Sequence, residues 1–147
     1  MTADFLDTYL PYLLRQADQE LSAAFYDALN GHGVQRSEWR VLAVLAGREP
    51  MSMRDLTDIA LSPQPTVTHA VTRLEKRGLV QRLQGTEDRR QRFVSVTESG
   101  AALAAQLIQE AQELEAAALA RIETGDLSGL INELRLLIDN LKEARSD

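Results

Sequence analysis

Arginines and acids cluster in the short stretch GTEDRRQRF. Glu87 and Asp88 run directly into Arg89 and Arg90, and Arg92 follows. Guanidinium groups suit the recognition of phosphates and base edges, because they present several N–H donors in a fixed planar fork. Short apolar runs flank the stretch and predict two strands of a hairpin, with the arginines at its tip. An arginine-rich tip in a chain of acidic net charge indicates a local contact with a polyanion.

A second group of polar side chains lies on the helix predicted from Ser62 to Gly78. Its apolar positions share one helical face, and the first carboxylate appears only at Glu75. Thr, Gln and His side chains can hydrogen-bond to base edges or backbone oxygens, whereas early acids would repel phosphates. An ordinary solvated face is the alternative, but such a face usually includes Asp or Glu near its start. The polar positions of this helix are Gln64, Thr66, Thr68, His69, Thr72, Arg73 and Lys76.

The net charge of −6 is distributed unevenly along the chain. Residues 1–35 carry −4, residues 36–97 carry +4, and residues 98–147 carry −6. A basic middle between acidic ends favours contact of the middle with a polyanion, with chance scatter of surface charge as the alternative.

Composition limits the class of protein and its compartment. A chain of 147 residues suits one domain or a compact domain with an appendage, and 44% hydrophobic and 26% charged residues are typical of a globular protein. The absence of cysteine excludes disulfides and thiolate metal sites within the chain. No apolar run approaches the length of a membrane span, and the N-terminus does not resemble a signal peptide. We therefore expect a cytoplasmic protein.

Periodicity and capping signals predict helices separated by short links. The first predicted helix covers residues 4–29, with Pro11 as a kink or as its true start. Four helix starts are expected where a hydroxyl residue precedes an apolar-periodic run: Ser37, Ser52, Ser62 and Thr97. At Ser52 the signal is strengthened by Asp55 three residues later and by Met51 and Leu56, which are placed to form a hydrophobic staple. At Ser62 it is strengthened by Pro63, the next residue. Three of these predicted helices end at Leu61, at Gly78 and at the segment TGDLSG. After that segment, residues 130–144 predict a last helix with a Leu/Ile stripe.

Three short helices followed by a two-stranded hairpin is the order of a winged helix-turn-helix. The expected fold is therefore mainly α with a small two-stranded β wing. Residues 36–97 would form the DNA-binding domain, and residues 1–35 and 98–147 would form a helical dimerisation region. The last helix cannot bury its apolar stripe against a small winged domain alone, and pairing across a two-fold axis would cover it.

The residues from Ser37 to Gly100 resemble the MarR family of bacterial transcription regulators. DRRQRFVSVTESG matches that family's wing signature of Asp, any residue, Arg, an apolar strand, Thr, two residues and Gly. TVTHAVTRLEKRGLVQR is similar to its recognition helix and first wing strand. The outer helices match only in placement and length.

This resemblance implies a homodimer that binds a palindromic site in double-stranded DNA. It also implies that many members are repressors released by small, often aromatic and acidic, ligands. In the wing, Arg90 would enter the minor groove, where narrow A·T-rich stretches concentrate negative potential. Asp88 would orient Arg90 by a charge-assisted hydrogen bond, and Arg89 and Arg92 would contact the DNA backbone or remain exposed.

The same resemblance assigns roles to residues of the two helices of the turn motif. Candidates for base contacts are Pro65, Thr66 and His69, and candidates for phosphate or base contacts are Ser62, Gln64, Thr68 and Arg73. Ser52 and Arg54 would meet a phosphate at the N-terminus of the preceding helix, where free N–H groups favour anions.

A ligand pocket is expected between the dimer helices and the winged domain. Tyr12, Arg15, Arg36 and Trp39 are the candidates, since aromatic walls with a guanidinium suit an aromatic carboxylate, although the two aromatic residues could equally be core. No cofactor or metal is expected. An enzyme is disfavoured because the chain has two histidines, no phosphate loop and no nucleophile elbow. A winged domain that docks to protein is the other alternative, and the arginine-rich hairpin argues against it.

Overall fold

The computed structural model describes residues 4–122 and 125–146. The chain divides into two compact units, Met1–Glu115 and Ala116–Asp147. The first unit contains most of the chain, including every strand, and the second contains the end of one helix and the last helix. We describe each unit by itself.

The N-terminal helical region begins with α1 (Phe5–Thr8), followed by α2 (Leu10–Gly31). One long helix was predicted here, but Tyr9 has an extended backbone and separates the two. Pro11 lies in the first turn of α2, where its missing N–H needs no partner. Of the two predicted roles for Pro11, the structure therefore gives it the role of marking the helix start. Only two residues of α2, Phe25 and Leu29, are buried.

Three short helices follow: α3 (Arg36–Leu45), α4 (Met53–Ala60) and α5 (Gln64–Lys76). Ser52 caps α4 as predicted, because its Oγ accepts a hydrogen bond of 3.1 Å from the N–H of Asp55. The predicted cap at Ser37 is wrong. The N-cap of α3 is Gln35, whose side chain forms a capping box with Glu38. The predicted cap at Ser62 is also wrong, since Pro63 holds the N-cap position of α5.

The turn between α4 and α5 is made by Leu61, the C-cap of α4. Its φ of 52° lies in the left-handed region, which costs a residue with a Cβ about 1–2 kcal/mol. The side chain of Leu61 is 88% exposed. The predicted helix reached this residue, but the left-handed turn ends it one residue earlier.

The hairpin consists of β2 (Val80–Gln84) and β3 (Arg92–Val96), paired antiparallel from Val80–Val96 to Gln84–Arg92. A third strand, β1 (Met51–Ser52), pairs with the other edge of β3 and gives the order β1-β3-β2. The sheet was predicted to have two strands. A two-residue strand leaves no alternating pattern in the sequence, so β1 could not be expected from it.

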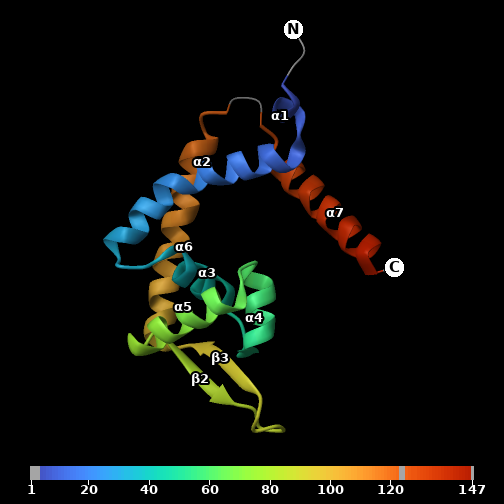
Figure 1. Cartoon of the computed structure of the whole chain (residues 1–147). Helices are drawn as coiled ribbons and strands as arrows, with labels where there is room; N and C mark the ends of the chain where they lie inside the picture. The colour runs from blue at the N-terminus through green and yellow to red at the C-terminus, as the bar shows by residue number, and fades with distance from the viewer. Residues whose placement is uncertain (1–3, 123–124, 147) are drawn as a thin grey trace. The chain divides into compact units, whose positions relative to one another are not determined.

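A single hydrophobic core joins α2, α3, α4, α5, the sheet and the start of α6 (Glu98–Leu119). Figure 1 shows the hairpin projecting from this helical part, with β2 following α5. The core positions at most 2% exposed include residues from each of these elements: Leu29, Val41, Leu42, Leu45, Leu56, Val67, Ala70, Val71, Leu74, Val80, Val94, Ala104 and Leu107.

Thr97 connects the end of the wing to α6, as its predicted capping role requires. Its Oγ1 accepts from the N–H of Gly100 at 3.1 Å and donates to the carbonyl of Gly78 at 2.6 Å. A Cβ added at Gly100 would overlap the carbonyl oxygen of Leu79. Through these contacts, the Thr-x-x-Gly part of the wing signature packs the start of α6 against the link between α5 and β2.

The second unit contains α7 (Leu127–Ser146), which has no buried residue. The predicted interruption before it begins at Thr124, which lies outside the described residues. Across residues 4–122 and 125–146, no helix has both the length and the apolar character that crossing a membrane requires.

Candidate nucleic-acid interface

The surface of α5 is divided by the helical period into a buried face and an exposed crest. Val67, Ala70, Val71 and Leu74 are buried. At 100° per residue, the residues opposite them are those at positions 65, 69, 72 and 76. Pro65, His69 and Lys76 are all exposed, as are Gln64 and Thr66, while Thr68 and Thr72 are half-buried. The crest therefore carries an imidazole and an ammonium group and no carboxylate.

One flank of α5 is held by the start of α3. The guanidinium of Arg73 donates to Ser37 Oγ at 3.0 Å and lies 3.6 Å from the carboxylate of Glu38. One turn later, Arg77 donates to the carbonyl of Gly33 at 2.9 Å and lies 3.8 Å from the same carboxylate. The contact of Arg73 with DNA stays a prediction, and the geometry gives its guanidinium partners within the protein.

The other flank of α5 is held by the first wing strand. Arg82 donates through its side chain to Glu75 Oε1 at 2.8 Å and to Thr72 Oγ1 at 3.0 Å. Its backbone N–H also donates to Glu75 Oε2 at 3.2 Å. These three bonds fix the direction in which the wing leaves the helix. Glu75, the first acid on α5, is thus paired with an arginine of the wing.

The predicted contacts at the starts of α4 and α5 have different surroundings. Arg54, in the first turn of α4, is exposed and makes no ion pair among the residues that the structure describes. The Oγ of Ser52 is engaged as the cap of α4. The Oγ of Ser62 donates to the carbonyl of Ala60 at 3.1 Å and accepts from Arg40 at 3.2 Å.

The wing tip is shaped by backbone bonds and by one carboxylate. Asp88 Oδ1 accepts from the backbone N–H of Arg90 at 2.9 Å, and the Asp88 carbonyl accepts from Gln91 N–H at 3.1 Å. The hydrogen bond predicted between Asp88 and Arg90 thus has the main-chain N–H of Arg90 as its donor. Arg89 and Arg90 are exposed, and Arg92 donates to the carbonyl of Arg89 at 3.3 Å. Asp88 shapes the turn from which Arg90 projects.

The structure adds three residues to the candidate site that the sequence did not indicate as functional. Lys76 was noted only as a surface residue, although its helical spacing from His69 is a signal that could have placed it on the crest. Arg82 and Glu38 act through partners on other elements. No sequence spacing indicates such pairs, because they depend on how α3 and the wing pack against α5.

The four candidates for the ligand pocket do not share one cavity within the described residues. Tyr12 and Arg15 line a cavity of about 400 Å³ on the N-terminal helices. Arg36 stacks over the ring of Tyr26, 4.0 Å from its centroid. Trp39 packs edge-on against Phe25, with ring centroids 4.9 Å apart, and also lines a different cavity.

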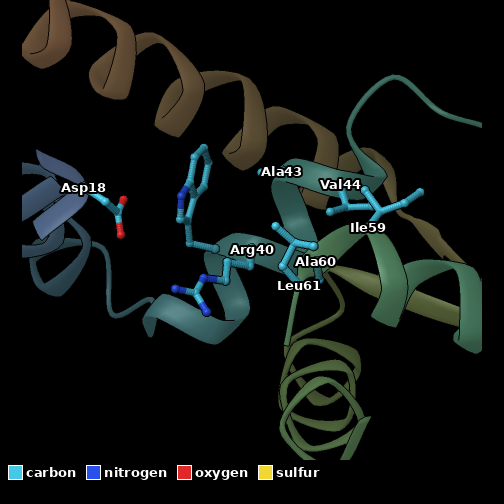
Figure 2. Close-up of a pocket in the computed structure, with 8 residues that line it drawn as sticks. Asp18, Arg40, Ala43, Val44, Ile59, Ala60 and Leu61 are labelled. Atoms are coloured by element: carbon cyan, nitrogen blue, oxygen red, sulfur yellow. The ribbon is translucent and has the colours of Figure 1, made fainter. Parts of the chain in front are cut away.

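The cavity that Trp39 lines has a volume of about 420 Å³ and lies between α2, α3 and the end of α4. Figure 2 shows Asp18 and Arg40 toward one side of it and Ile59, Ala60 and Leu61 toward the other. One side is thus charged and the other apolar. The cavity borders the α4–α5 turn, so a molecule inside it would touch the segment that positions α5. Among the described residues, no group of His, Asp and Glu is arranged to hold a metal ion.

Three short helices, α3 to α5, followed by the β2–β3 hairpin have the order of a winged helix-turn-helix. The sequence profile described as "MarR family" matches residues 32–91. The chain is 30% identical over 133 residues to the transcriptional repressor NicR of Pseudomonas putida, covering 90% of this chain and 84% of NicR. The chain belongs to the MarR family of transcriptional regulators.

Solved structures agree with this assignment. A MarR-family regulator from Silicibacter pomeroyi superposes with a TM-score of 0.81 at 36% identity, covering 94% of this chain and 98% of that one. NadR, solved in complex with 4-hydroxyphenylacetate, superposes with a TM-score of 0.74 at 28% identity, covering 98% and 97% of the two chains. The expected mainly helical fold with a small β wing is confirmed by these neighbours.

Proposed function

We propose that this protein is a sequence-specific repressor that binds a palindromic site in double-stranded DNA as a homodimer. The observation that carries the proposal is the crest of α5, free of acids, beside a wing that ends in exposed arginines. The crest would enter the major groove and supply base contacts from Pro65, Thr66 and His69. Membership of a family that contains the repressor NicR supports the regulatory role.

Contacts to the DNA backbone would surround these base contacts. We assign phosphate contacts to Arg54 and Arg89 and a minor-groove contact to Arg90. The remaining proposed contacts and supporting residues are Ser52, Ser62, Gln64, Thr68 and Asp88, with Lys76 added from the structure. The DNA contact of Arg73 stays a prediction and is not part of this assignment, because its guanidinium already has partners within the protein.

Selection of bound duplexes from random DNA tests the DNA-binding proposal. The expected product is a site with two-fold symmetry and half-sites about one helical turn apart, as two recognition helices of a dimer require. Failure to enrich any sequence over the starting pool, at a salt concentration that permits non-specific binding, would refute sequence-specific recognition.

The homodimer is proposed from apolar surface that each unit leaves exposed. On α1, on α2 and at the residue between them, the exposed large residues include Phe5 at 66%, Leu10 at 47% and Tyr9 at 43%. On one face of α7 they include Leu130 at 55%, Leu141 at 55% and Ile138 at 49%. Monomeric proteins rarely expose contiguous apolar patches of this kind, and a second copy of the chain would cover them. Sedimentation of the protein as a monomer at micromolar concentration would contradict this.

We further propose that a small aromatic acid regulates DNA binding. The cavity beside Trp39 offers an apolar wall and the guanidinium of Arg40, which together suit a ring with a carboxylate. NadR, solved with 4-hydroxyphenylacetate, supports this class of ligand. A panel of aromatic acids at millimolar concentration should raise the melting temperature and release DNA, and Arg40→Gln should abolish both effects. A panel that causes neither effect would remove the proposal's support.

A further inference from the structure

Glu38 is a buried carboxylate in a domain proposed to bind a polyanion. The residue is 3% exposed and lies in the first turn of α3, outside the crest of α5. A buried carboxylate is costly unless it is paired and hydrogen-bonded. Its negative charge also lowers the attraction of the domain for phosphates. The role of Glu38 must therefore compensate for the cost of burying a charge and for the weaker attraction to phosphates.

The capping of α3 does not require this charge. Glu38 Oε1 accepts from the backbone N–H of Gln35 at 3.2 Å, which completes the capping box. A glutamine at this position can accept the same bond, since capping boxes use either residue. The ionised group is needed only for the two arginines beside it.

Those arginines are Arg73, in the last turn of α5, and Arg77, the C-cap residue that follows it. Arg73 and Arg77 lie 3.6 and 3.8 Å from the carboxylate, and each also has a hydrogen bond that ties it to the α3 side of the domain. The two guanidinium groups thus have fixed orientations although their side chains are 39% and 41% exposed. Without the carboxylate, both side chains would gain rotamer freedom and reach phosphates of any sequence.

We propose that Glu38 is a specificity-determining residue, which positions α5 through Arg73 and Arg77 and withholds these two arginines from non-specific phosphate contacts. The proposal rests on the function proposed above, in which α5 reads the DNA sequence. Glu38 does not touch DNA itself and acts only through its partners. Its effect is on the ratio of specific to non-specific affinity rather than on affinity alone.

The test compares Glu38→Gln with the wild type on two duplexes of equal length, the selected site and a random sequence. Glu38→Gln keeps the volume and the capping bond of the side chain. We expect binding to the selected site to weaken and binding to random DNA to strengthen, so that the specificity ratio falls at least tenfold. The salt dependence for random DNA should steepen by about one to two units of slope per protomer, one for each arginine that gains a phosphate.

Glu20→Gln is the matched control, because it makes the same chemical change at an exposed position of α2. It removes the same charge and should leave the specificity ratio at the wild-type value. A loss of folded protein alone would lower both affinities of Glu38→Gln by the same factor and leave its ratio unchanged. An unchanged ratio would overturn the proposal, whereas a wild type without sequence preference would overturn the proposed function instead.

A double-mutant cycle separates action through the arginines from a general effect of the substitution. In a chain with Arg73→Gln and Arg77→Gln, adding Glu38→Gln should change the specificity ratio by less than twofold. The same further tenfold loss in that background would show that Glu38 acts by another route, and would also overturn the proposal.

Discussion

Arg82 of the first wing strand and Glu75 of α5 form a two-point contact. The side chain of Arg82 donates to one carboxylate oxygen at 2.8 Å, and its main-chain N–H donates to the other at 3.2 Å. A pair made in this way holds both an arginine and the strand that carries it. The angle between the wing and the proposed recognition helix therefore depends on one carboxylate.

Replacement of Arg82 by lysine should weaken DNA binding almost as much as replacement by alanine, by about tenfold. Lysine keeps the charge but cannot make the same set of planar bonds to Glu75 and Thr72. The free energy of unfolding should change by about 1 kcal/mol or less, because the pair is partly exposed. Titration of both variants against the selected duplex is the measurement, and wild-type affinity of Arg82→Lys would show that only the charge matters.

Gly100→Ala should destabilise the protein by about 1–3 kcal/mol or more, the usual effect of overpacking. A methyl group at this position would overlap the carbonyl oxygen of Leu79 and the side chain of Val96. Gly31→Ala is the control, since a Cβ there meets nothing within 4 Å. Urea unfolding of both variants gives the comparison, and equal midpoints would contradict the close approach seen at Gly100.

Arg90→Ala should leave the melting temperature unchanged, because the side chain is exposed at the wing tip. The affinity for the selected site should fall by about 1–3 kcal/mol per half-site, the range of a good specific contact. Arg89→Ala, which would remove a phosphate contact, should weaken binding to all sequences and lower the salt slope by about one unit per half-site. Equal effects of the two variants on specific and random DNA would argue against the minor-groove role of Arg90.

Asp88→Ala and Asp88→Asn make the wing more positive by the same amount, but only Asp88→Ala should weaken DNA binding. Asparagine retains an oxygen that can accept from the main-chain N–H of Arg90, whereas alanine loses the bond that shapes the turn. We expect Asp88→Asn to bind DNA at least as tightly as the wild type and Asp88→Ala to bind more weakly. Tighter binding by both variants, measured at one salt concentration, would show that Asp88 contributes only its charge.

Local signals in the sequence were sufficient for the elements of the proposed DNA-binding region. The apolar period of residues 64–76, the cap at Ser52 and the β-prone runs around the arginines each report on residues close along the chain. Capping and periodicity depend on neighbours within about four residues, so a single sequence contains the information they need. The Thr97–Gly100 signature was also visible, although its contact with Leu79 was not.

Only the tertiary structure decided which polar side chains are exposed and which are engaged within the protein. Arg73 looked like another residue of the exposed face, but it faces Glu38, which lies 35 positions earlier in the chain. Arg82 and Glu75, the third strand at Met51, and the separation of Tyr12 from Trp39 into different cavities likewise depend on packing between elements. Such pairs carry no fixed spacing, because the energy of an ion pair depends on distance and burial in space and not on separation along the chain.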